Sequence, residues 1–191
     1  MKDNDNNISR RSFARRGSLA LAAGFFAPFP AGAMRPAPVE RVAMFQEAGP
    51  KGVVCLICPN ECTLKDGELS DCHNRIARKS KLYTMAFGNP CAVNTDPVEK
   101  KPLYHFLPGT TAFSIATAGC NLACLNCQNW TISQTSPDKT RNFDLLPPDV
   151  VAQAAAGGCR SIAYTYSEPV TFYEYVYETS RLAREKGIKN I

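Results

Sequence analysis

The sequence predicts an α/β fold: a partial parallel (βα) barrel, truncated after about two βα units and preceded by a small cysteine-rich, metal-binding segment. Short apolar stretches at 113–117, 161–164 and 188–191 alternate with helical stretches at 147–156 and 170–186. This alternation favours a parallel sheet, because each helix carries the chain back to the start of the next strand. Two such units and a strand stub cannot close a barrel, so we expect the chain to be incomplete.

Local signals set the limits of these elements. Pro147 and Pro148 suit the first turn of a helix, and Gly157 is typical of a position just past a helix end. In the second helix apolar residues recur at helical spacing, and Gly187 ends it. Upstream, weak alternation of apolar residues over 81–93 suits short strands.

The chain divides into four segments. Residues 1–33 read as a twin-arginine signal peptide, 34–52 as a linker, 53–110 as the cysteine-rich segment and 111–191 as the incomplete α/β domain. Arg10 and Arg11 are followed by an apolar run and by an A-x-A site that ends at residue 33. The run is too short to span a bilayer, and a disordered basic tail is the alternative.

The signal predicts where the protein acts. We expect export to the periplasm or another extracytoplasmic compartment, with membrane contact only through the export machinery, and a cytoplasmic location if the signal is not used. The net charge is +5, of which residues 1–33 carry +3. The remainder is too nearly neutral to indicate a nucleic-acid partner.

Cysteine spacing carries the chemistry. Cys120, Cys124 and Cys127 form C-x3-C-x2-C in the loop after the strand at 113–117. Cysteine thiolates are the usual ligands of iron–sulfur clusters, and three of them would leave one iron of a [4Fe–4S] cluster open to a substrate or cofactor. Zinc with a distant fourth ligand, or unconnected buried cysteines, are the alternatives.

A second set lies upstream. Its spacing is C-x2-C-x3-C-x9-C, and its members are Cys55, Cys58, Cys62 and Cys72. Four thiols this close in sequence can surround one metal, and small loop-rich segments often need a metal to fold. The four cysteines are compatible with zinc or with a second iron–sulfur cluster, and disulfide bonds are the alternative. Cys91 and Cys159 are single and are expected to be buried.

Three stretches together resemble a known family. Residues 96–109, 117–134 and 163–169 are similar to the radical S-adenosylmethionine (SAM) superfamily, and within it to the AmmeMemoRadiSam system radical SAM enzymes, close to the pyruvate formate-lyase and other glycyl-radical activating enzymes. The resemblance implies that SAM chelates the open iron and is cleaved reductively to a 5′-deoxyadenosyl radical, which abstracts hydrogen from an unknown substrate. It also implies an electron donor such as flavodoxin or ferredoxin.

The resemblance assigns cofactor-binding residues and no catalytic residue. Glu168 occupies the place where the superfamily contacts the SAM amino group, and Tyr166 and Ser167 would supply backbone contacts. The paired glycines usual before the acid are absent here. Asn126 stands where the family has an aromatic residue beside the adenine, so only a backbone contact is implied. A carboxylate at position 168 would also be favourable simply as a charge before a helix start.

The sequence therefore predicts a radical SAM enzyme of oxidoreductase type. It could act on a small molecule or on a protein, as a glycyl-radical activase does. We expect this stretch of chain alone to be inactive, because further strands should complete the wall of the site. The alternative is a non-catalytic exported iron–sulfur or zinc-binding electron-transfer protein. Glu168 and the βα pattern favour the enzyme, because an electron carrier needs neither.

Overall fold

The computed structural model describes residues 40–191. The expected signal peptide, residues 1–33, and the first part of the expected linker lie outside the described residues. Within residues 40–191 no helix is long and apolar enough to cross a membrane.

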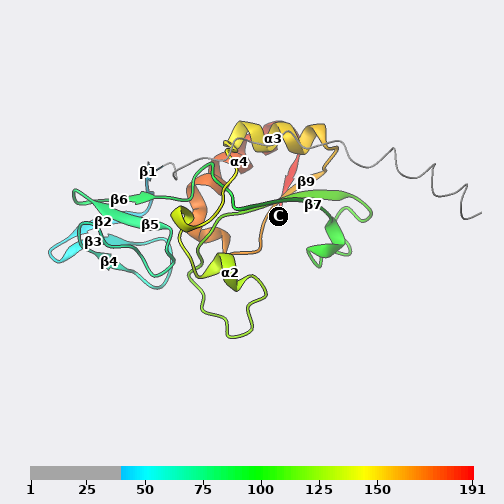
Figure 1. Ribbon diagram of the computed structural model, residues 1–191. Coiled ribbons are helices and arrows are strands. Elements are labelled where there is room, and N and C mark those ends of the chain that lie inside the picture. Colours follow the sequence, from blue (N-terminus) through cyan, green and yellow to red (C-terminus); the bar gives the residue numbers. More distant parts are fainter. Residues whose placement is uncertain (1–39) are drawn as a thin grey trace, which may run out of the picture. The chain divides into compact units, whose positions relative to one another are not determined.

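The predicted partial parallel barrel is wrong. The described part of the chain is a mixed α/β structure with three small sheets, two of them wholly antiparallel (Figure 1). It holds only three α-helices: α2 (Trp130–Ser133), α3 (Pro147–Ala156) and α4 (Tyr173–Glu185). The cause lies upstream of β7, where short turns join strands, and a two-residue turn can connect only antiparallel neighbours.

The two antiparallel sheets share the first half of the described chain. One has the order β1 (Arg41–Val42), β6 (Lys81–Thr84), β5 (Arg75–Arg78), and the other runs β2 (Gln46–Gly49), β3 (Gly52–Cys55), β4 (Thr63–Leu64). Part of the expected linker therefore forms strands, since β1 pairs with β6 and β2 pairs with β3. Each sheet gains a strand that local sequence did not indicate.

The third sheet carries the expected βα pattern on an antiparallel edge. Its order is β10 (Lys189–Asn190), β9 (Ser161–Tyr164), β8 (Thr111–Ala116), β7 (Ala92–Pro97). β8, β9 and β10 are parallel, whereas β7 pairs antiparallel with β8. The limits predicted for α3 and β9 are confirmed. The second predicted helix is divided into a 3-10 helix, η3 (Pro169–Phe172), and α4.

Two separate cores hold these layers together. The larger lies between the third sheet and helices α3 and α4, and includes Phe113, Ile162 and Tyr175. Strands β8 and β9 are buried along almost their whole length, as expected for strands covered on both faces. The smaller core lies between the two antiparallel sheets and includes Val53, Leu64 and Leu82. Two further 3-10 helices, η1 (Val98–Lys100) and η2 (Pro137–Lys139), lie in the connections.

A buried ion pair joins the antiparallel strands to α4. Arg75 at the start of β5 donates from Nη2 to Glu174 Oε1 at 2.7 Å, and the two side chains are 0% and 3% exposed. Arg75 Nη1 also donates to the Met44 carbonyl at 2.7 Å, and Glu174 accepts from the Met44 N–H at 2.6 Å. Removing two charges from water is costly, so each group depends on the other to stay buried.

We predict that Glu174→Gln destabilises the protein by about 3–5 kcal/mol, because it leaves the Arg75 charge buried without a counter-charge. Arg181→Gln is the matched control on the same helix: it breaks the exposed Arg181–Glu185 pair and should cost less than about 1 kcal/mol. Urea unfolding measures both. The double variant Arg75→Met, Glu174→Leu should recover most of the loss, and equal effects of the two single variants would contradict this account.

Candidate functional site

The first cysteine set lies on a loop that leaves the end of β8. The loop runs below the sheet to α2 (Figure 1). Gly119 N–H donates to the Ile132 carbonyl at 2.8 Å, and Gln134 Nε2 donates to the Leu122 carbonyl at 3.0 Å, which closes the loop onto α2. Cys124 is exposed, whereas Cys120 and Cys127 are half-buried. The loop thus presents its thiols toward solvent-accessible space.

The three thiols and the segment after β9 line one cavity of about 280 Å³. Its lining includes Cys120, Cys124 and Cys127 together with residues 164–169. The two segments meet because β8 and β9 are parallel neighbours, so their C-terminal ends lie at the same edge of the sheet. Open α/β sheets bind ligands at this edge.

Three of the four residues assigned to SAM line this cavity. Tyr166 has a left-handed backbone, φ 68°, and its carbonyl accepts from Asn129 Nδ2 at 3.0 Å. Ser167 is buried, and its hydroxyl donates to the Thr117 carbonyl at 2.8 Å. No described residue donates to the Glu168 carboxylate, and Glu168 directly precedes η3 without a side-chain hydrogen bond to it. Glu168 is therefore the lining acid available for a cation.

Asn126 is placed differently. It is exposed on the cysteine loop and is not among the residues that line the cavity. Asn129, three positions on, is the loop amide that reaches the segment after β9. A backbone contact by residue 126 to a ligand stays a prediction.

Three cysteine thiols are the donor type that an iron–sulfur cluster takes, and one loop carries all three. All nine cysteines are free, and within residues 40–191 no three Cys, His, Asp or Glu side chains lie close enough together to hold one metal ion. Two buried polar atoms near the loop, Thr117 Oγ1 and Asn121 Oδ1, have no partner among the described residues.

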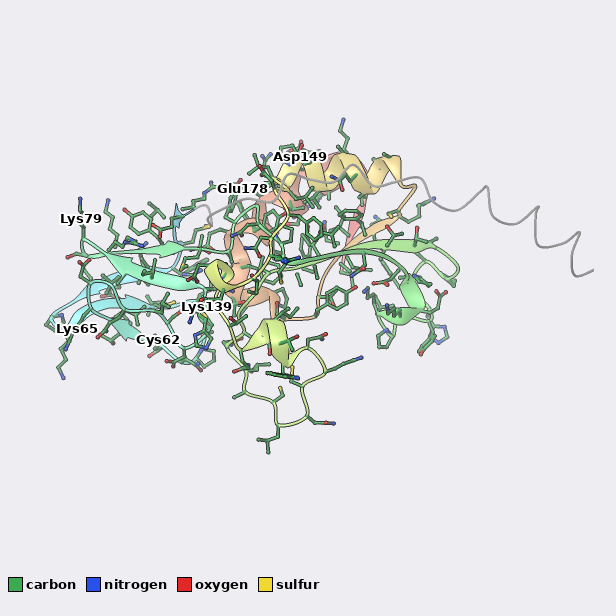
Figure 2. All side chains as sticks on the ribbon, in the orientation of Figure 1. Cys62, Lys65, Lys79, Lys139, Asp149 and Glu178 are labelled. Carbon is green, nitrogen blue, oxygen red and sulfur yellow. The ribbon has the colours of Figure 1, made fainter. Side chains whose placement is uncertain are left out.

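The second cysteine set lies with the antiparallel sheets (Figure 2, at Cys62). Cys55 N–H donates to the Cys62 carbonyl at 2.9 Å, so the two residues face each other just beyond the ladder of β3 and β4. Ser70 Oγ lies 3.1 Å from Cys72 Sγ, and Arg75 Nη1 lies 3.8 Å from Cys55 Sγ. Burial raises the pKa of the Cys62 and Cys72 thiols, so a metal would have to displace their protons.

Gly119 lies at the contact between the two cysteine sets, a role that residue spacing does not indicate. A Cβ on Gly119 would lie 2.4 Å from the Cys72 carbonyl oxygen and 2.6 Å from Asn74 Oδ1. Asn74 is fully buried and donates from Nδ2 to Thr171 Oγ1 at 3.0 Å. Thr171 in turn donates to the Glu168 carbonyl at 2.8 Å. The segment after Cys72 thus supports both the cysteine loop and the Glu168 segment.

Replacing Gly119 by Ala should destabilise the protein by roughly 3 kcal/mol, because a positive-φ strain and a collision with backbone act together. Gly67→Ala is the control, since Gly67 has a similar φ of 84° against 91° but nothing within 4 Å of its Cβ position. It should cost only about 1 kcal/mol. The free energy of unfolding in urea separates the two, and equal losses would show that crowding at Gly119 is relieved at no cost.

Comparison with known proteins gives one relative of interest. Over 152 residues, 79% of this chain, the sequence is 45% identical to the uncharacterized protein MJ0808 of Methanocaldococcus jannaschii. The chain spans about half the length, 46%, of that relative. No protein-family profile matches the chain, and no solved structure matches it. The relative's name carries no activity, so function must be argued from the chemistry of the site.

Proposed function

We propose that this chain is part of a radical SAM enzyme whose [4Fe–4S] cluster is held by Cys120, Cys124 and Cys127. The observation that carries the proposal is that these three thiols and Glu168 line one cavity at the ends of β8 and β9. When bound, the reduced cluster supplies the electron that cleaves the carbon–sulfur bond of SAM and so begins hydrogen abstraction from a substrate.

The side chains of the cavity have separable tasks in this proposal. Glu168 would bind the amino group of SAM, because its carboxylate is not engaged by any described residue and an ammonium ion is its natural partner. Ser167 would position the neighbouring backbone through its bond to the Thr117 carbonyl. Asn129 would hold the strained backbone of Tyr166 where the two segments meet. An electron donor of the flavodoxin or ferredoxin type would reduce the cluster at the exposed Cys124 side.

The cavity favours an enzyme over an electron carrier. A carrier needs only the cluster and a surface for its partner, whereas this site adds an unpaired acid and a space of about 280 Å³ beside the thiols. Catalytic sites are concave and need such convergent polar groups. The second cysteine set would hold a separate metal, zinc or iron–sulfur, that stabilises the antiparallel sheets.

The cluster assignment is tested by iron content after anaerobic reconstitution. The protein should bind about four irons with absorbance bleached by dithionite, and Cys120→Ala, Cys124→Ala, Cys127→Ala combined should lose them. Cys91→Ala is the matched control, because this single thiol does not line the cavity and burial raises its pKa to about 11. Unchanged iron in the triple variant would refute the proposal.

Glu168→Gln separates SAM binding from cluster binding. Iron content should be unchanged, because Glu168 is not a ligand, but addition of SAM should no longer alter the electron paramagnetic resonance spectrum of the reduced cluster. Glu178→Gln, on the exposed side of α4, should leave the SAM response intact. A normal SAM response in Glu168→Gln would remove the assigned role of this carboxylate while leaving the cluster.

The second metal is tested in the triple cysteine variant, so that the first set contributes nothing. We expect about one zinc ion per chain in competition with a chromophoric chelator. Adding Cys55→Ser and Cys62→Ser should abolish that binding, whereas adding Cys91→Ser should not. Zinc that survives the loss of Cys55 and Cys62 would contradict a site at these cysteines.

A further inference from the structure

A second and larger cavity adjoins the one lined by thiols. Its volume is about 660 Å³, and it shares Tyr164, Thr165 and Tyr166 with the smaller cavity. Its other walls include the end of η1, with Lys100 and Lys101, and amide side chains from three positions: Asn94, Gln128 and Asn129. A volume of this size is typical of sites for small molecules.

The side-chain charges at this cavity do not balance within the described residues. Lys100 Nζ donates to Asp96 Oδ1 at 2.8 Å, and Lys101 Nζ donates to Asp96 Oδ2 at 2.7 Å. Asp96 is the acid that pairs with both lysines, and no acidic side chain lines the cavity. Among the side chains, two ammonium ions share one carboxylate, so one positive side-chain charge is left over at the wall. The Lys101 side chain is only 6% exposed, so its charge is held in a fixed position at the wall.

Asp96 cannot neutralise the remaining positive charge, because its single negative charge is already shared by both lysines. Its Oδ2 also accepts from Ser114 Oγ at 3.1 Å and from the Tyr166 hydroxyl at 2.6 Å. Burial alone would raise the pKa of Asp96, but the hydrogen bonds from Lys100, Lys101 and Tyr166 outweigh it and hold the pKa well below its usual range. The carboxylate is therefore ionised and saturated, and it serves to hold the two lysines in place.

Tyr166 connects the two cavities. Lys101 Nζ lies 4.7 Å from the centre of its ring, and Asn94 Nδ2 donates to its hydroxyl at 3.3 Å. Tyr166 also lines the cavity that contains the thiols. A molecule held by the lysines would thus contact the same residue that borders the proposed SAM site.

We infer that the larger cavity binds a small-molecule substrate through a carboxylate or phosphate group held by Lys100 and Lys101. An anion restores the charge balance, and the neighbouring amides supply further hydrogen-bond donors. That the bound molecule is a substrate rests on the proposed function, whereas the anion site itself does not. SAM also carries a carboxylate, but the thiols and Glu168 that would receive SAM line the other cavity.

The test uses the cluster-free protein and inorganic phosphate at low ionic strength, with binding followed by the amide resonances in nuclear magnetic resonance spectra. Saturable shifts are expected at Lys101, Asn129 and Tyr166. Lys100→Glu should weaken phosphate binding at least about threefold, because it replaces a positive charge at the wall by a negative one. Lys100 is exposed, so the substitution should leave the buried Lys101–Asp96 pair intact. Lys65→Glu, which makes the same charge change beside β4 (Figure 2), should not weaken it.

Three outcomes would overturn the inference: no saturable shift, equal weakening by Lys65→Glu, or displacement of phosphate by excess SAM, which would assign the site to SAM itself. Its failure is distinguishable from that of the proposed function, because phosphate binding needs no iron. If phosphate binds but the cysteine loop takes up no iron, the radical SAM assignment is overturned. The anion site then stands, but its ligand is no longer identified as a substrate. Iron binding without phosphate binding would overturn the anion site alone.

Discussion

The Arg75–Glu174 pair is the interaction on which the arrangement of the described chain depends. Neither charge can stay out of water alone, and both also bind the Met44 backbone, so β5, the β1–β2 connection and α4 must come together for any of them to be satisfied. Arg75 Nε and Glu174 Oε2 have no partner among the described residues, so the pair is costly as well as necessary. Such a pair selects one arrangement of the elements more than it stabilises that arrangement.

The same constraint reaches the candidate site through packing. Arg75 follows directly on Asn74, and Asn74 lies against Gly119 and donates to Thr171. Thr171 belongs to η3, which leads into α4 and therefore to Glu174. The cysteine loop and the Glu168 segment are thus held from one side by the segment that follows Cys72. A metal bound by the second cysteine set would order that segment and, by contact alone, the loop of the first set.

The two cavities differ in the chemistry they offer. One combines thiols with an unengaged carboxylate, which suits an iron–sulfur cluster and a ligand with an ammonium group. The other combines two lysines with amides and suits an anion. Tyr166 lines both cavities; Asn129 binds its left-handed backbone, and Asp96 accepts from its hydroxyl. Strain of this kind persists only where surrounding contacts over-determine it.

The sequence by itself determined what depends on local spacing: α3 between its prolines and glycine, the buried strand β9, and a cysteine loop placed after β8. It did not determine the fold class, because the direction of the strands upstream of β8 depends on which strands pair. The spacing of apolar residues and the β-propensity of each segment do not encode strand pairing. The parallel pairing of β8 and β9 that the sequence predicts brings Glu168 to the thiols. Only the tertiary structure set Asn126 outside the cavity and placed Asn74 on Gly119. These are contacts between segments far apart in the chain, and they form only when packing and buried charge require them.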